Sequence, residues 1–575
     1  MSGQNSAITN EVIRHALLFA ADEVAKSLSR TAYNTVVYEI RDYGIGIHDA
    51  AGDVVADAPG VALFTRGNDY GIKKAVEFLG GPQAMGAGDV FMLNYPYWSS
   101  AHALDVLVFA PIHAGDRLIG YASCRIHVLD LQQKDPGYVL DSRSMYEEGI
   151  FFPAVRLYTG GQQNTDIYNI IQFNSRIPDR TIGDIQAQVA AVFAGVRRTQ
   201  AIVERHGVDA VVEAMAAINE HGEKLARLAL AKLPKGTWSA EDLVDSDGIS
   251  LDVPVTLRVT VTVTDDEFIV DWRGTDRDVE GPINVPYGGT EAISSLIFKA
   301  LTTPDTPVVA GNFAPLRTIT EPGSVVHAVP PMPTFTLWTN ILAGEVVLKA
   351  LAVGMPDRIP ASSGGDVSSM MGLGVNPRTG ESWLEATNEA VGFGGHAGGD
   401  GEDGIMHLSE PGCRNNPVEV LETKAPMVID HYGYRPDSGG AGRHRGGVGV
   451  SRVYRFLADS SAICLVYKTK SAPYPLQGGM PGTNNHMVSN PGTDRAQNTS
   501  GRYVHLAAGE VLANNTGGGG GYGDPFERDP AAVARDVRNE LVSVGAAASQ
   551  YGVVVSADGT VDEHATTELR SARVG

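Results

Sequence analysis

Three residues of the segment 94–130 carry side chains that can bind metal ions or transfer protons: His102, Asp105 and His127. An apolar run with the β-branched content of a buried strand follows Asp105. A turn around Gly115 and a second apolar run complete the pattern of a β-hairpin. Cross-strand partners lie roughly 5 Å apart, so the spacing predicts Asp105 opposite or beside His127. All three side chains are then expected at one end of the hairpin.

Two imidazoles and a carboxylate form a ligand set that suits Zn²⁺ or Mn²⁺ and leaves an open position for water or substrate. Such a site needs neutral imidazoles, so its metal affinity should fall as pH drops through the histidine range, about 6.5. The alternative is structural, because histidines are common at strand ends and a His-x-x-Asp pattern also occurs by chance. The spacing alone leaves both readings open.

Composition limits the class of protein. The chain has 575 residues, of which 43% are hydrophobic and 19% charged, which is ordinary for a globular protein with several cores. A net charge of −22 argues against nonspecific nucleic-acid binding, which needs a basic surface. The three cysteines are far apart and form no Cys-x-x-Cys motif, which favours a reducing cytosol. Neither a signal peptide nor an apolar run long enough for a membrane span is expected.

Helical and strand patterns alternate in the first part of the chain. Residues 9–32 predict an amphipathic helix, and 38–56 a hairpin whose first strand contains Asp42. A buried strand carboxylate needs a partner, so Asp42 is a candidate fourth ligand; the alternative is a surface strand end. Further patterns predict a helix over 70–80, a loop over 135–152 and helices over about 181–230.

Near residue 235 the helical period gives way to alternation. This change predicts two regions, 1–235 with the metal-binding hairpin and 236–575 with glycine-rich loops. Residues 249–275 predict two strands around Asp265 and Asp266. The remaining predicted helices cover 290–302, 341–354 and about 530–548. The expected fold class is therefore mixed α/β (α+β), with sheets in both halves.

Glycine clusters occur at 363–365, 392–404, 438–447 and 517–521. None ends in the Gly-Lys-Ser/Thr of a phosphate loop or follows a strand as a dinucleotide-binding fingerprint. Glycines used for tight turns and close packing are the better interpretation. There is no Gly-x-Ser-x-Gly nucleophile motif, and Cys124 lies in an apolar strand, as a core residue would.

Taken together, the collinear motifs give the chain a resemblance to a known family, over nearly its whole length. The motifs are Arg41-Asp42-Tyr43, the segment around His102 and Asp105, Tyr146-Glu147-Glu148-Gly149, Gly281-Pro282-Ile283-Asn284, and the segments 416–422, 435–442 and 517–525. The chain resembles the B subunits of the hydantoinase/oxoprolinase group, which includes homologous subunits of acetone and acetophenone carboxylases. Many members have a His-His pair where this chain has His127-Val128.

The resemblance implies an ATP-dependent enzyme made of two kinds of subunit. An actin-like A subunit would bind ATP and phosphorylate an amide or carbonyl oxygen, and the B subunit would carry one divalent metal ion and open a cyclic amide. The two are expected to form a hetero-oligomer such as α2β2. By motif match the ligands would be Asp42, His102, Asp105 and His127. Asp130, Glu147 and Glu148 are candidates for base or supporting roles, and the alternative for each is an acidic loop residue that serves solubility.

Two other functions remain open at this point. One is a subunit of an ATP-dependent ketone carboxylase, although the chain is shorter than the acetone carboxylase subunit. The other is a noncatalytic scaffold that orients the ATPase partner, for which stoichiometric metal would not be needed.

Overall fold

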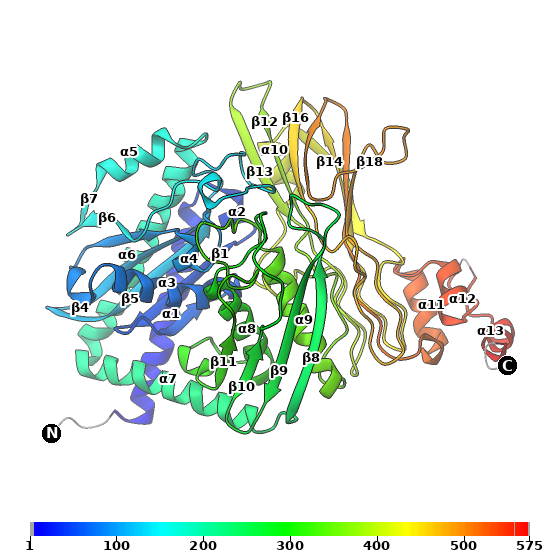
Figure 1. Cartoon of the computed structure of the whole chain (residues 1–575), viewed down its shortest axis with the longest axis horizontal. Helices are drawn as coiled ribbons and strands as arrows, with labels where there is room; N and C mark the ends of the chain where they lie inside the picture. The colour runs from blue at the N-terminus through cyan, green and yellow to red at the C-terminus, as the bar shows by residue number, and fades with distance from the viewer. Residues whose placement is uncertain (1–4, 557, 573–575) are drawn as a thin grey trace.

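The mixed α/β class with sheets in both halves is confirmed, and the described residues form four β-sheets (Figure 1). The computed structural model describes residues 5–556 and 558–572. Within these residues no helix combines the length and apolar character that crossing a membrane requires. The N-terminal sheet with its helices lies at one end of the molecule, and the short C-terminal helices α11, α12 and α13 project at the other.

The first sheet has seven strands in the order β2-β1-β5-β4-β3-β6-β7. The strands are β1 (Tyr43–Asp49), β2 (Val54–Ala58), β3 (Val90–Leu93), β4 (Asp105–Ala114), β5 (Arg117–His127), β6 (Val155–Thr159) and β7 (Gln162–Gln163). The helices of this region are α1 (Ala7–Thr31), α2 (Thr35–Tyr38), α3 (Ala62–Phe78), α4 (Pro96–Ser99), α5 (Thr165–Phe173), α6 (Pro178–His206) and α7 (Val208–Leu230).

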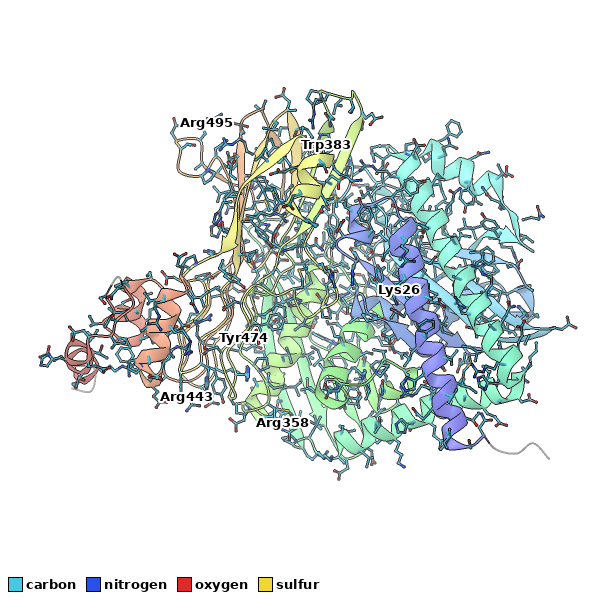
Figure 2. All side chains as sticks on the ribbon, turned by 180° about the vertical axis from the view of Figure 1, so that it is seen from behind. Lys26, Arg358, Trp383, Arg443, Tyr474 and Arg495 are labelled. Atoms are coloured by element: carbon cyan, nitrogen blue, oxygen red, sulfur yellow. The ribbon has the colours of Figure 1, made fainter. Side chains whose placement is uncertain are left out.

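Both faces of this sheet are buried, which explains the unbroken apolar run of β4. Successive side chains of a strand point to opposite faces. Val106 and Val108 therefore pack in the core beneath α1 and α6, and Leu107 and Phe109 pack in the core beneath α3. Figure 2 shows α1, which carries the exposed Lys26, running along the outside of this layer. The predicted helix over 70–80 begins earlier, at Ala62.

The second sheet, ordered β11-β10-β9-β8, contains two strands that the sequence analysis missed, β8 and β11. Its strands are β8 (Gly236–Val244), β9 (Val255–Val263), β10 (Phe268–Asp271) and β11 (Leu316–Ile319). The predicted pair around Asp265 corresponds to β9 and β10, and β8 pairs antiparallel with β9 along its whole length. Two helices complete this layer, α8 (Tyr287–Thr302) and α9 (Trp338–Gly354), and α9 packs on β8 and β9.

The third and fourth sheets stand beside each other in the C-terminal half (Figure 1). One is ordered β13-β12-β16-β19 and the other β14-β15-β20-β17-β18. Their elements are β12 (Ser369–Val375), β13 (Ser382–Asn388), α10 (Val418–Lys424), β14 (Met427–Tyr434), β15 (Val450–Phe456), β16 (Ser460–Leu465), β17 (His486–Ser489), β18 (Gln497–Asn498), β19 (Arg502–Leu506) and β20 (Val511–Asn515).

The C-terminal helix predicted over about 530–548 is two helices. These are α11 (Pro530–Arg538) and α12 (Val544–Tyr551), and α13 (Glu563–Ser571) follows them. Glu540 has a φ of 59° and Ser543 caps the start of α12, so the chain turns between the two helices. Arg528 attaches this group to the body through an ion pair with Asp400.

The glycine clusters pack backbone against backbone. Gly392 donates to the carbonyl of Gly517, Gly519 donates to Gly447, and Gly447 donates to Phe393. A Cβ atom on Gly519 would lie 2.0 Å from the carbonyl oxygen of Phe393. The segments lie too close together for any side chain, so these glycines serve close packing, as the sequence analysis favoured.

Replacing Gly519 with alanine is expected to destabilise the protein by about 3 kcal/mol or more, because rigid backbone must move to admit the new methyl group. Gly545 is the matched control: it is exposed on α12, and its Cβ would have no neighbour closer than 3.9 Å. Gly545→Ala should be neutral or slightly stabilising. Guanidinium unfolding of the two variants measures the difference, and equal midpoints would contradict this description of the glycine core.

Candidate metal centre

The hairpin of β4 and β5 pairs Asp105 directly with His127. The Nδ1 atom of His127 lies 3.1 Å from Oδ1 of Asp105, and both side chains are buried. This is the register expected for a hairpin centred near Gly115, whose φ of 61° fits its place in the turn.

His102 and Asp42 come to the same end of the hairpin. Nε2 of His102 is 3.6 Å from Oδ2 of Asp105, and the rings of His102 and His127 lie with their centroids 4.9 Å apart. Asp42 lies immediately before β1, and its carbonyl accepts a hydrogen bond from the His127 N–H at 3.4 Å. It therefore enters the site from beside the strand, whereas the sequence analysis had placed it within the strand.

The donor atoms fit a divalent cation. His102, Asp105 and His127 each offer one ligand atom within 4.8 Å of the other two. Nδ1 of His102 and Oδ2 of Asp105 are buried without a hydrogen-bond partner. Buried polar atoms are normally satisfied, and imidazole nitrogens with carboxylate oxygens are ligands for Zn²⁺ and Mn²⁺. Asp42 is outside this tight group of three but lines the same cavity.

The cavity lies where the first sheet meets the start of α9 and the third sheet. Besides the four residues above, its lining residues come from segments far apart in the chain: Val36, Phe64, Tyr138, Leu337, Trp338, Ile341, Asp366, Val367, Ser368, Ser369, Met371, Ala386, Asn388, Glu410 and Leu465. The sequence analysis singled out none of these, because neither a motif nor a spacing connects them to the hairpin.

Carboxyl groups crowd one another in this cavity. Burial, together with the carboxylate of Glu410, holds the pKa of Asp42 well above its usual range. Burial and the charge of Asp105 raise the pKa of Glu410 to about 7. Burial also lowers the pKa of His102 to about 4, which keeps the imidazole neutral at physiological pH. For His127 burial acts in the same direction, but the hydrogen bond and charge of Asp105 outweigh it and raise the pKa.

Asp130, Glu147 and Glu148 do not line the cavity. Asp130 forms an ion pair with Arg176 at 2.7 Å. Glu147 lies in a short 3-10 helix and is partly exposed. Glu148 is buried and accepts hydrogen bonds from the Ser142 hydroxyl and the Thr334 N–H. The geometry gives no support to a base role for these three, which stays a prediction from the sequence.

Glu148 gives the folded protein a pH dependence that can be measured. Burial raises its pKa from 4.5 to about 8. Between these values the folded state holds a proton that the unfolded state has lost, so stability falls as pH rises through this window, by at most about 1.4 kcal/mol per pH unit.

The Glu148→Gln variant should lose this slope, because the amide does not titrate. The free energy of unfolding of both proteins is measured in urea at about pH 5.5 and pH 7.5. The difference between their pH dependences gives the contribution of Glu148, because the other titrating groups are common to both proteins. Identical slopes for the two proteins would show that Glu148 does not carry the proton.

A sequence model of the hydantoinase B/oxoprolinase family matches residues 6–525. A protein of Pseudomonas sp. (strain NS671), named as the B component of a D-/L-hydantoinase, is 29% identical over 98% of this chain and 98% of its own. The beta chain of the caprolactamase of Pseudomonas jessenii is 27% identical, over 98% of this chain and 99% of its own.

Two solved structures share the fold. A crystal structure of the ATP-dependent caprolactamase from Pseudomonas jessenii superimposes with a TM-score of 0.91 at 25% identity, over 99% of this chain and 100% of that chain. The nucleotide-free structure of an acetone carboxylase also has a TM-score of 0.91, at 19% identity, over 99% of this chain and 83% of that chain. The second likeness concerns the fold alone.

Proposed function

The chain belongs to the hydantoinase B/oxoprolinase family, and on that premise we propose that it is the ring-opening subunit of an ATP-dependent hydrolase of cyclic amides. The observation that carries the proposal is the convergence of His102, Asp105 and His127 in one cavity, with atoms free to bind a cation. An ATP-binding partner of the A-subunit type would phosphorylate the amide oxygen, and this chain would complete the hydrolysis.

Hydrolysis of an unstrained cyclic amide needs both a phosphorylation step and a separate ring-opening step. An unstrained amide is a poor electrophile, and phosphorylation of its oxygen creates a leaving group and an electron-poor carbon. Asp42, His102, Asp105 and His127 would hold a divalent cation, which would supply Lewis acidity when bound. The residues of this chain then have to hold the ring, orient the water and accept its proton.

Asp105 has the central position in this arrangement. Its two carboxylate oxygens face different histidines, Oδ1 toward His127 and Oδ2 toward His102. A carboxylate that contacts an imidazole fixes its tautomer and ring orientation. The ring of His102 is also stacked on Phe335 with centroids 5.2 Å apart, which limits its movement.

Glu410 is the carboxyl group best placed to accept a proton from the attacking water. It lines the cavity, and the amide of Asn388 donates to it at 3.4 Å. The buried Glu148, by contrast, is occupied by its bonds to Ser142 and Thr334. We therefore place the base function on Glu410, which the motif match did not single out.

A ketone carboxylase subunit is the second candidate, because the fold also matches acetone carboxylase. The caprolactamase chain is matched over its full length and at higher identity, whereas 83% of the carboxylase chain is covered. These differences favour a cyclic amide.

The test is a screen of lactams, hydantoins and ketones with the chain and its co-purified partner, following ATP consumption and product mass. Ring-opened product formed in step with ATP consumption is expected. Bicarbonate-dependent consumption of a ketone would instead establish a carboxylase, and a chain without stoichiometric metal would indicate a scaffold.

A further inference from the structure

The walls of the cavity carry four carboxyl groups and, among the residues that the structure describes, no lysine or arginine side chain. Asp42 and Asp105 stand beside the histidines, and Asp366 and Glu410 come from the C-terminal half. Much of the remaining wall is hydrocarbon, provided by Val36, Phe64, Trp338, Ile341, Met371 and Leu465. A ring bound here therefore meets apolar surface and acidic groups.

The neighbouring cations are used within the protein. Arg125 is fully buried behind the wall, donates to the carbonyl of Gly67 at 3.2 Å and lies over the ring of Phe64. Lys468 pairs with Asp242 at 3.1 Å. Neither side chain lines the cavity, so neither can serve as the counter-ion of a bound substrate.

A metal ion would not change this balance. A divalent cation held by Asp42 and Asp105 is matched by two carboxylate charges, and the walls then still carry Asp366 and Glu410. Oδ2 of Asp366 accepts from the N–H of Tyr467 at 2.7 Å, and Oδ1 accepts from the N–H of Val367. A carboxylate on the ring, in addition to the phosphoryl group, would be buried beside these carboxyl groups without a lysine or arginine to pair with, which is unfavourable.

We propose that this site accepts cyclic amides that carry no anionic substituent, and that it discriminates against rings bearing a carboxylate, such as 5-oxoproline. The inference rests on the proposed function, since it concerns the ring opened in the same cavity. The apolar wall binds the hydrocarbon part of a neutral lactam, and the absence of a cation excludes the charged analogue.

Three five-membered lactams separate size from charge: 2-pyrrolidinone, 5-oxoprolinamide and 5-oxoproline. 5-Oxoprolinamide carries a neutral carboxamide where 5-oxoproline carries a carboxylate, and the two groups have nearly the same shape. The phosphoryl group is common to all three, so it does not affect the comparison. With the reconstituted complex, ring-opened product per ATP consumed should be at least about tenfold higher for 5-oxoprolinamide than for 5-oxoproline.

A cation placed in the wall should reduce this preference. Asn388 ends β13, lines the cavity and donates to Glu410. Asn388→Lys should raise the ratio of 5-oxoproline to 5-oxoprolinamide turnover by about tenfold. Asn388→Met, of similar length and without charge, should leave the ratio unchanged.

Each outcome has a defined meaning. Ring opening of 5-oxoproline as fast as, or faster than, that of 5-oxoprolinamide by the unaltered complex overturns the inference and leaves the proposed function standing. The same follows if the lysine and methionine variants have equal ratios of 5-oxoproline to 5-oxoprolinamide turnover. Failure of all cyclic amides to be opened rejects the proposed function, and the inference with it. If the lysine variant does not fold, the product-per-ATP ratio of the unaltered complex decides.

Discussion

Replacing Asp105 with asparagine is expected to remove the metal ion and abolish ring opening. The carboxylate faces both histidines through separate oxygens, whereas the neutral amide has a single oxygen and no negative charge to offer a cation. Loss of a supporting residue around a metal typically costs roughly 10–100-fold in affinity, so loss of this central ligand should cost at least that much. ATP consumption by the partner can continue, because phosphorylation does not use this site. Metal content, ATP hydrolysis and product mass are measured on the same preparation.

His113 provides the matched control for this variant. It lies on β4, at the opposite end of the same hairpin, and it does not line the cavity. His113→Ala should keep both metal and activity, which shows that a substitution in the hairpin is not harmful in itself. A folded Asp105→Asn protein with full metal content and normal product formation would contradict the assigned role.

The isolated chain is expected neither to bind ATP tightly nor to open any cyclic amide. The run 517–521 is the sequence's most obvious glycine loop, but four of its five N–H groups already donate hydrogen bonds within the protein. Gly517 donates to Asn485, Gly519 to Gly447, Gly520 to Ser362 and Gly521 to Met480. A phosphate-binding loop needs free N–H groups that point at the ligand, so this run cannot provide one without breaking its packing.

Calorimetric titration of ATP into the isolated chain measures this directly. No heat of binding is expected in the micromolar range, and adding the partner should restore both ATP consumption and product. Micromolar ATP binding to a site within this chain would contradict the division of labour on which the proposed function rests.

The hairpin could be predicted because its information is local. A turn at Gly115 and two apolar runs of similar length fix the register, and the register places Asp105 opposite His127. The long amphipathic helix over 9–32 and the helices over 181–230 could be predicted for the same reason, because the helical spacing of their apolar residues is visible in consecutive residues.

The remainder of the cavity could not be predicted from local patterns. Glu410, Asp366 and Trp338 reach it from separate elements, and their positions depend on how the C-terminal sheets pack on the first sheet. Strand β8 was missed because it precedes the clear alternation of β9. Helices α11 and α12 were predicted as one helix because the turn between them needs a left-handed φ at Glu540, which a glutamate in the sequence does not indicate.

An anomalous diffraction map of the metal-loaded protein would decide whether the hairpin holds a metal ion. We expect one divalent ion in the cavity, with nitrogen and oxygen ligands at about 2.0–2.2 Å from His102, His127 and Asp105, and with Asp42 at or next to the ion. A metal peak elsewhere, or a loaded structure in which Asp105 and His127 move more than about 6 Å apart and cannot share one ion, would contradict the proposed metal centre.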